Sequence, residues 1–330
     1  IAADGSVTDA GPANVPKATL AFHRNTLIVT GSNGDTAPKA FTGVGVPSTL
    51  AGSPPFAIYG TVYKDRTVLA NTLGSPQRVW FGPAGNPAGT WDTTQSWIDA
   101  DYAVSGIASL RNALIIFSTV QVERIIGSTP PPGTDMSRQA LFQPGCIDAR
   151  SIVIADDTCY FANPTGLYQT DGAAILDVTE KGGMKRYWQE LFSTYTSTWT
   201  VTGVRLRNWV VYSIMDDATF KDAFAIDIAS RVWVRLANMK FLGAWQSVEA
   251  APESFFGWRG GPRVGKLSSL FMPSAGVKND ADGIPVAPQM ETAWFPLGAS
   301  KAQIRDIYAA YDIRDAATDD PVLTMGYLLS

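Results

Sequence analysis

The sequence predicts an all-β protein: a β-propeller of about six four-stranded blades, with one short helical insertion and a small C-terminal β addition. Three observations support this fold class. Thirty Gly and twenty-one Pro residues punctuate the 330-residue chain. Short runs rich in branched and aromatic residues lie between them, as in strands joined by turns. One strand–turn–strand pattern recurs at intervals of 41 to 51 residues, close to the roughly 40–45 residues of a propeller blade.

Each copy of the repeat has a short apolar element, two polar turn residues and a strongly apolar strand. The first copy, for example, reads LAFHRNTLIVTG. We interpret each copy as the inner hairpin of one blade. The predicted turns of the six copies are, in order, Arg24-Asn25, Asp65-Arg66, Arg111-Asn112, Asp156-Asp157, Arg207-Asn208 and, in the weakest copy, Pro252-Glu253.

Further strands are expected after the inner hairpins of copies two to five. Residues 78–82, 122–127 and 166–172 would supply a third strand, and the last of these ends in Asp171-Gly172, a strong hairpin signal. In the fifth copy, residues 223–236 read as a complete hairpin. Each unit therefore supplies about four strands, and stacking such units around an axis buries both faces of every sheet.

Two segments interrupt the repeat. Residues 180–192 (EKGGMKRYWQELF) have the pattern of a helix and lie in the 51-residue interval, so we predict a helical insertion between blades. Residues 127–145 contain Pro130 to Pro132, which favour an extended backbone. We expect an irregular insertion between the third and fourth blades, either ordered against a partner subunit or a flexible surface loop.

The predicted organisation has three parts. Residues 1–272 form the propeller, 273–289 form a linker or loop rich in Gly, Pro, Asp and Asn, and 290–330 form C-terminal strands. These strands would either close the propeller or, as we favour, form a small sheet beside it. A count of six or seven blades stays open, because the N-terminal residues and the last strands could complete another. The C-terminal strand candidates are 290–298, 304–314 and 322–330.

Composition narrows the function classes. Charged residues make up 17% of the chain, against about 25% in an average soluble domain. There are also ten Trp, eleven Tyr and fifteen Phe residues. This favours aromatic surface buried against other subunits, although aromatic-rich strands can equally fill a core. The net charge of −4 argues against a basic nucleic-acid grip, but it is compatible with a surface past which DNA slides.

The chain carries no targeting signal that we recognise. No apolar run reaches the length of a transmembrane helix, and no signal-peptide pattern occurs. The sequence begins at Ile1 without an initiator Met, which is consistent with residues missing or removed before it.

No catalytic, cofactor-binding or metal site is predicted. His23 is the only histidine, and no nucleophile motif surrounds it, so we interpret it as an exposed turn residue. Walker A, HExxH and GxSxG motifs are absent. Cys146 and Cys159 lack CxxC spacing and cannot form a disulfide framework. Cys159 reads as a core residue, and a reducing compartment is expected.

Carboxylates and tryptophans leave a carbohydrate-active alternative open. Glycosidases use paired carboxylates, but most Asp candidates fall in turns, where Asp bonds to nearby backbone, and the repeated Asp box of sialidase-like propellers is missing. We interpret these acids as solvated turn residues. The Trp candidates would stack on sugars in a lectin-like site, fill the core or contact subunits. The acids are Asp99, Asp101, Asp156, Asp157, Asp216 and Asp217; the tryptophans are Trp91, Trp97, Trp188, Trp199 and Trp258.

Five segments and a helical stretch follow one another in an informative order. The segments are LRNALIIFSTVQVERIIGS, GCIDARSIVIADD, CYFANPTGLYQTDG, AIDIASRVWVRL and METAWFPLGASKAQIRDIY, with EKGGMKRYWQELF before the fourth. In this order and local pattern, over about residues 100 to 320, the chain resembles the tail-hub, nozzle and packaged-DNA stabilisation β-propeller proteins of short-tailed bacteriophages. It is shorter than a full-length member of that family is expected to be.

The resemblance implies a structural virion protein rather than an enzyme. Copies would form a homo-oligomeric, six-fold ring in the phage tail or neck, beneath the portal or adaptor, after synthesis in the host cytoplasm. The ring would line the DNA channel, retain packaged DNA and release it on ejection, without sequence-specific binding, a membrane or a cofactor. The alternatives are a carbohydrate-binding or glycosidase-like propeller and a scaffold propeller that binds cellular proteins.

Overall fold

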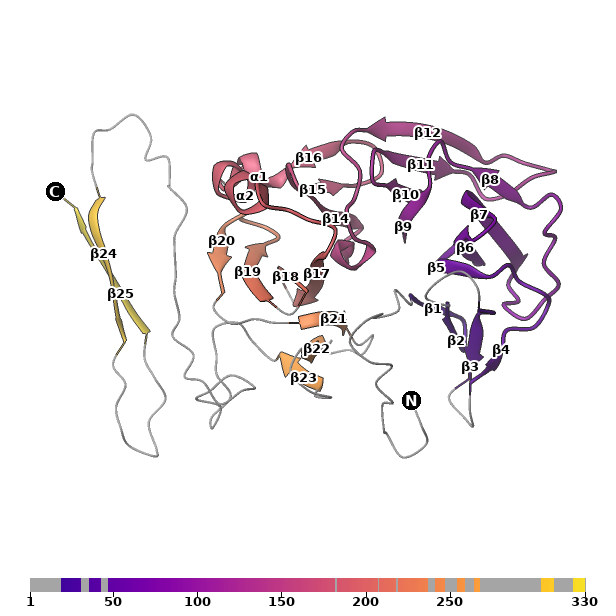
Figure 1. Ribbon diagram of the computed structural model, residues 1–330, viewed down its shortest axis with the longest axis horizontal. Helices are drawn as coiled ribbons and strands as arrows, with labels where there is room; N and C mark the ends of the chain where they lie inside the picture. The colour runs from indigo at the N-terminus through magenta and orange to yellow at the C-terminus, as the bar shows by residue number, and fades with distance from the viewer. Residues whose placement is uncertain are drawn as a thin grey trace.

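The computed structural model is built almost entirely of small antiparallel sheets (Figure 1). Within the described residues, five of these sheets have four strands each, one has three strands and one has two. The all-β propeller prediction is therefore confirmed, but the prediction of about six four-stranded blades is wrong, since the described part of the chain contains five. The structure describes residues 19–30, 36–42, 47–181, 183–206, 208–217 and 219–236 and the strands 241–246, 254–258, 264–267, 304–311 and 323–329.

The first three sheets follow the chain order of their strands. In sheet one these are β1 (Leu20–His23), β2 (Thr26–Val29), β3 (Lys39–Phe41) and β4 (Ser48–Thr49). Sheet two contains β5 (Ala57–Tyr63), β6 (Arg66–Thr72), β7 (Ser75–Ala84) and β8 (Trp97–Asp99). Sheet three contains β9 (Val104–Ser109), β10 (Leu114–Ser118), β11 (Val122–Ile126) and β12 (Ser137–Phe142).

The remaining sheets continue in the same way. Sheet four contains β13 (Val153–Ala155), β14 (Thr158–Asn163), β15 (Gly166–Thr170) and β16 (Ile175–Asp177). Sheet five contains β17 (Trp199–Leu206), β18 (Trp209–Asp216), β19 (Thr219–Asp227) and β20 (Trp233–Arg235). Sheet six contains β21 (Phe241–Gln246), β22 (Ser254–Trp258) and β23 (Val264–Leu267), and a separate hairpin contains β24 (Ile304–Tyr311) and β25 (Leu323–Leu329).

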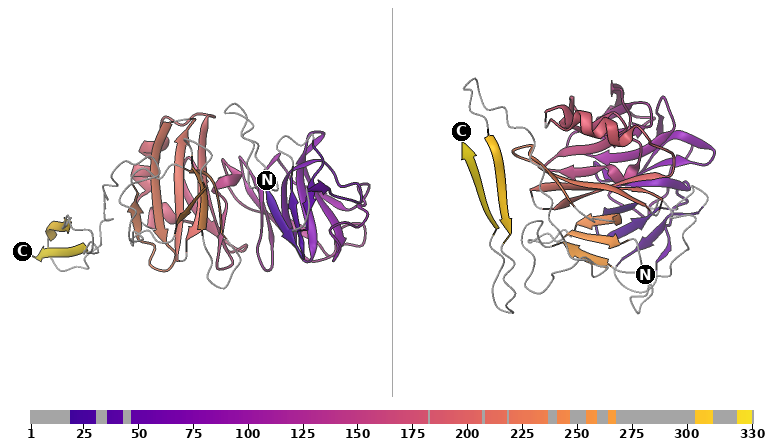
Figure 2. Two further views of the ribbon diagram at one scale, coloured as in Figure 1. Left: turned by 90° about the horizontal axis from the view of Figure 1, so that it is seen from below. Right: turned by 60° about the vertical axis from the view of Figure 1, so that its left-hand side comes forward.

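Successive sheets meet along their first strands. Contacts join β1 to β5, β5 to β9, β13 to β17 and β17 to β21, and the short helix η1 (Ala149–Ser151) contacts both β9 and β17. Figure 1 shows the sheets following one another along an arc with these strands toward its inside, and Figure 2 shows them side by side from below. Each of these sheets is thus a blade, and sheets two to five each lie between two neighbouring sheets.

The inner-hairpin turns fall close to their predicted positions. The first, third and fourth turns match the sequence prediction, and the fifth falls at the predicted junction, between the end of β17 at Leu206 and the start of β18 at Trp209. The second is displaced by one residue, because β5 ends at Tyr63 and β6 begins at Arg66, so the turn is Lys64-Asp65. Three polar residues follow one another there, and the sequence alone does not decide which two form the turn. The sixth predicted turn, Pro252-Glu253, lies outside the described residues.

The predicted helix over 180–192 is two helices. Helix α1 spans Val178–Lys181 and helix α2 spans Lys185–Phe192. Gly183, between them, has a positive φ of 70°, a conformation that glycine adopts without steric cost and that a continuing helix cannot use. The helices lie between sheets four and five, as an inter-blade insertion should.

The segment 127–145 is more regular than predicted. It includes β12, which pairs with β11 as the fourth strand of sheet three. The prediction of an irregular insertion between blades is therefore wrong for residues 137–142, whose sequence SRQALF lacks the strong apolar signal of the inner strands. At the C-terminal end, β24 and β25 fall within two predicted strands and pair antiparallel. The predicted strand 290–298 and linker 273–289 lie outside the described residues.

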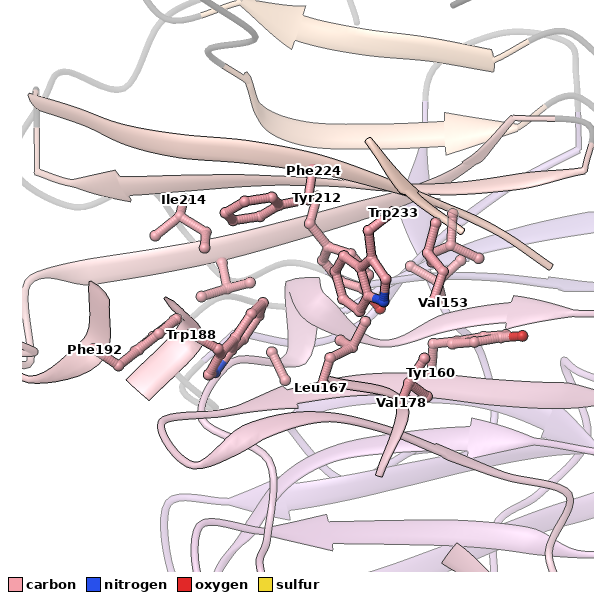
Figure 3. Packing of buried hydrophobic residues seen from close by; sticks show 14 of the residues in the cluster. Val153, Tyr160, Leu167, Val178, Trp188, Phe192, Tyr212, Ile214, Phe224 and Trp233 are labelled. Carbon is pink, nitrogen blue, oxygen red and sulfur yellow. The ribbon is translucent and has the colours of Figure 1, made fainter. Parts of the chain in front are cut away.

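Apolar clusters fill the spaces between neighbouring sheets. The largest joins sheets four and five with helix α2, where the rings of Trp188 and Phe192 stack 4.9 Å apart and Trp188 Nε1 donates to the carbonyl of Asn163 (Figure 3). Cys146 and Cys159 are free thiols buried in the cluster between sheets three and four. The prediction that Cys159 is a core residue is confirmed.

We expect Trp188→Ala to lower the free energy of unfolding by about 3–5 kcal/mol, because it empties a site that is fully buried and removes a satisfied indole hydrogen bond. Equilibrium denaturation in urea, followed by tryptophan fluorescence and circular dichroism, measures this loss. Leu73→Ala is the control, since Leu73 is 79% exposed, and it should change stability by less than about 0.5 kcal/mol. Equal losses in the two variants would contradict the assignment of Trp188 to the core.

Candidate functional site at the inner-hairpin turns

Polar links join the inner-hairpin turns of neighbouring sheets, so these turns gather at one end of the propeller. We call this set the turn rim. Its members combine both charges, and each contacts the adjacent sheet through a side chain or a backbone group. They are Arg24, Lys64, Asp65, Arg111, Asp156, Asp157 and Arg205.

His23 and Arg24 link sheet one to sheet two. Arg24 donates two hydrogen bonds to the Asp65 carboxylate, at 2.7 and 3.2 Å. His23 Nε2 lies 3.1 Å from Asp65 Oδ1, and its Nδ1 lies 2.9 Å from Thr67 Oγ1. The interpretation of His23 as an exposed turn residue is wrong, because the side chain is only 1% exposed. It is the last residue of β1 and shares with Ala21 the face that meets sheet two.

The order Asp65–His23–Thr67 has the residue types of a catalytic triad, but the geometry does not provide an active site. In a triad the nucleophilic hydroxyl must be open to substrate. Thr67 is fully buried, whereas Asp65, at the other end of the chain of contacts, is the exposed member. The arrangement therefore fastens two sheets together.

Similar links cross the next three junctions. Lys64 Nζ donates to the backbone carbonyl of Arg111 at 2.9 Å, which joins sheets two and three. The backbone N–H of Arg111 donates to Asp157 at 2.7 Å, which joins sheets three and four. Arg205 Nη2 donates to Asp156 at 2.6 Å, which joins sheets four and five. Every junction among the five four-stranded sheets thus carries a polar link at this end.

Two turns of the rim use an unfavourable backbone. Lys64 and Asp65 have φ values of 48° and 57°, and Asp156 and Asp157 have 49° and 60°. Two-residue hairpins favour Asn-Gly here because glycine avoids the left-handed penalty of about 1–2 kcal/mol per residue. These turns instead carry the charged side chains that reach the adjacent sheets. The unfavourable φ values therefore occur in the same turns whose side chains contact the adjacent sheets.

The pKa shifts of Asp65 and Arg24 in the turn rim arise mainly from the hydrogen bonds between these two side chains. Hydrogen bonds from Arg24, and secondarily from His23, lower the pKa of Asp65 from 3.8 to about 2. The same hydrogen bond raises the pKa of Arg24. Both side chains are more than half exposed, so water and salt screen this pair and its contribution to stability is small.

The predicted candidate acids Asp99, Asp101, Asp156, Asp157 and Asp216 form ion pairs, so they are not simply solvated turn residues. Arg78 holds Asp99 with two hydrogen bonds. Lys221 lies 3.0 Å from Asp216, and Asp217 occupies the turn that follows β18. The others pair with arginines: Asp101 with Arg138, Asp156 with Arg205, and Asp157 with Arg111.

Three acids that the sequence analysis missed are buried. Glu123, Asp148 and Asp222 have exposures of 1%, 5% and 2%. Each is held by an arginine: Glu123 by Arg138, Asp148 by Arg150, and Asp222 by Arg235. The sequence gives little signal for them, because only the folded packing distinguishes a buried acid in a strand or loop from a solvated one.

The sequence left each candidate tryptophan as a sugar-stacking, core or subunit-contact residue, and the structure places three of them in the core. Trp91, Trp188 and Trp199 are at most 5% exposed and belong to the core, so none of these three presents a ring face to a sugar. Trp97 is half-buried, with the Arg78 guanidinium 3.6 Å from its ring centre. Trp258 lies in β22, and its side chain is outside the described residues.

The described residues contain neither a metal-ligand cluster nor a membrane-spanning helix. Within those ranges, no group of three or more His, Cys, Asp or Glu residues is arranged to hold a metal ion. In the same part of the chain, none of the helices has the length and apolar character needed to cross a membrane.

Comparison with known proteins gives structural similarity without a family. No protein-family model matches the sequence, and no curated protein matches it. The SapL1 lectin in complex with α-methyl fucoside is 12% identical, with 77% of this chain and 96% of that chain covered and a TM-score of 0.41. The AfRom2 CNH domain is 7% identical, with 73% and 90% covered and a TM-score of 0.34. Similarity at this level carries no inference about function.

We expect Asp65→Asn to remove a stabilisation that depends on pH. The pKa of the folded carboxyl is depressed, so its stabilisation is complete above the ordinary value of 3.8 and is lost as the pH falls toward about 2. The wild-type protein should therefore have the higher Tm at pH 5, and the difference should shrink as the pH falls from 3.8 through about 2. Thermal scans by circular dichroism measure this, with Glu180→Gln, an exposed acid of α1, as control. A difference that grows as the pH falls would refute this role of the Arg24–Asp65 pair.

Arg138→Ala should be costly, because it leaves the Glu123 carboxylate buried without its cation. Breaking a buried pair in this way typically costs about 3–5 kcal/mol. The double variant Arg138→Ala/Glu123→Gln should recover most of the loss, since the glutamine keeps hydrogen-bonding capacity without charge. Urea denaturation of both variants measures the difference, and a double variant no more stable than the single one would disprove this account.

Proposed function

We propose that the chain is a structural, non-enzymatic subunit of a phage virion: one copy of a homo-oligomeric ring in the tail or neck that lines the DNA channel and helps to retain and eject DNA. The observation that carries the proposal is the order of the segments that resemble the short-tailed phage propeller proteins. Four of the five, together with the helical stretch, overlap in chain order with β10 and β11, with η1 and β13, with β14 and β15, with α1 and α2, and with β19 and β20.

The use of polar groups supports a structural role. The rim residues, the ion-paired acids and the buried acids contact other sheets or neighbouring strands of the same chain. An enzyme instead presents such groups to a substrate in a cleft. In the described part of the protein, the polar groups named above form hydrogen bonds and ion pairs within the chain. Such internal bonding suits a subunit that must bear load within a particle.

Charge is also compatible with a DNA channel. The chain has a net charge of −4, and the arginines and lysines described above largely face carboxylates or backbone carbonyls. A surface of this kind does not grip phosphates, whose binding needs unpaired cations. DNA would pass such a surface with weak, sequence-independent contact, as retention followed by ejection requires.

The test is the assembly state of the purified full chain. Sedimentation equilibrium should give a mass about six times that of one chain, and negative-stain electron microscopy should show rings with a central opening. A parallel glycan-binding measurement covers the carbohydrate alternative. A stable monomer that binds glycans would overturn the proposal, and a ring without glycan binding would support it.

A further inference from the structure

One face of sheet one is apolar and exposed. On β1, Ala21 and His23 point toward sheet two and are buried, whereas Leu20 and Phe22 point the opposite way with exposures of 60% and 64%. Large apolar side chains this open on the first strand of a blade are unusual, because that strand is packed on both sides in a closed propeller.

The strand register extends this face across three strands. Phe22 pairs with Leu27, which pairs in turn with Phe41, and Leu20 pairs with Val29. Directly paired residues lie on the same face of a sheet. Leu20, Phe22, Leu27, Val29 and Phe41 therefore form one apolar surface, which we call the outer face of sheet one. Lys39 pairs with Val29 at its margin and donates from Nζ to Thr49 on the neighbouring strand.

The opposite face of sheet one is also apolar, and it packs against the neighbouring sheet. There Ala21, Ile28 and Leu50 form a buried cluster with Val62 of sheet two. Apolar clusters likewise join sheets two and three, three and four, and four and five. The outer face has the same chemistry as these junctions, so a sheet with an apolar face is the occupant that it fits.

We propose that the outer face of sheet one is the docking surface for sheet six of the same chain, so that β21–β23 close the propeller. Sheet six contacts sheet five through β21 and β17, and Figure 1 shows it along the arc between sheet five and sheet one. Its strands include Phe241, Trp245, Phe255 and Phe256 in their sequence, the composition of a packed blade. This closure is independent of the proposed virion function.

Photo-crosslinking in the full-length chain tests the closure. Phe22→p-benzoylphenylalanine keeps an aromatic side chain on the face, and Leu20→p-benzoylphenylalanine is a second probe in case the first variant folds poorly. Isotope-labelled and unlabelled protein are mixed before irradiation, and the joined peptides are identified by mass spectrometry. We expect crosslinks to residues 241–267 within one chain. The control probe is at Leu73, in the turn between β6 and β7, which should not reach that segment.

Three other outcomes of the crosslinking overturn the proposal. Mixed light–heavy products would show that a second copy occupies the face. Crosslinks to residues 1–18 or 268–329 would show that another segment does, and a yield no higher than at Leu73 would show an open face. A stability measurement is an independent check: Phe22→Asp should lower the Tm by several degrees while Leu73→Asp leaves it unchanged, and an unchanged Tm for Phe22→Asp also overturns closure. Neither result bears on ring assembly, which sedimentation of the wild-type chain decides separately.

Discussion

The four-stranded sheets of this protein are apolar on both faces, and that constraint governs the rest of the described architecture. Strand β10 is buried at every position. Its alternate residues serve two different interfaces: Leu114 and Ile116 pack toward sheet two, whereas Ile115 and Phe117 pack toward sheet four. A strand of this kind is stable only between two other sheets. Stacking must therefore continue from sheet to sheet, and a closed ring is the arrangement that leaves no final face in water.

Apolar packing does not by itself fix how one sheet is oriented on the next, because hydrophobic contact has no direction. Hydrogen bonds are directional, and this protein places them where the sheets converge. The Arg24–Asp65 and Arg205–Asp156 pairs each join a turn or strand of one sheet to a turn of the adjacent sheet. Exposed pairs of this kind add little stability. Their contribution is to the register between blades, and this explains charged residues in turns whose backbone favours glycine.

The sequence predicted what depends on local pattern and missed what depends on packing. Two polar residues between apolar runs gave four of the inner-hairpin turns, since such turns are determined locally. Where three polar residues occur together, at residues 64–66, the prediction was displaced by one. For most residues of the candidate site, the sequence did not predict burial or the contacts between sheets. The burial of His23 and Glu123 depends on a neighbouring sheet or strand that no local pattern specifies, whereas Cys159, inside a continuous apolar strand, was predicted to be in the core.

The distribution of polar groups connects the architecture to the proposed role. A binding or catalytic site requires polar groups that are held in position but left available to a ligand. In the described sheets, the buried acids Asp148 and Asp222 are held by Arg150 and Arg235. The exposed acids of the turn rim face cations of a neighbouring blade. Polar contacts of this type hold neighbouring blades and strands against one another. The proposed ring subunit would need such contacts, because it would have to keep its shape while DNA moved past it.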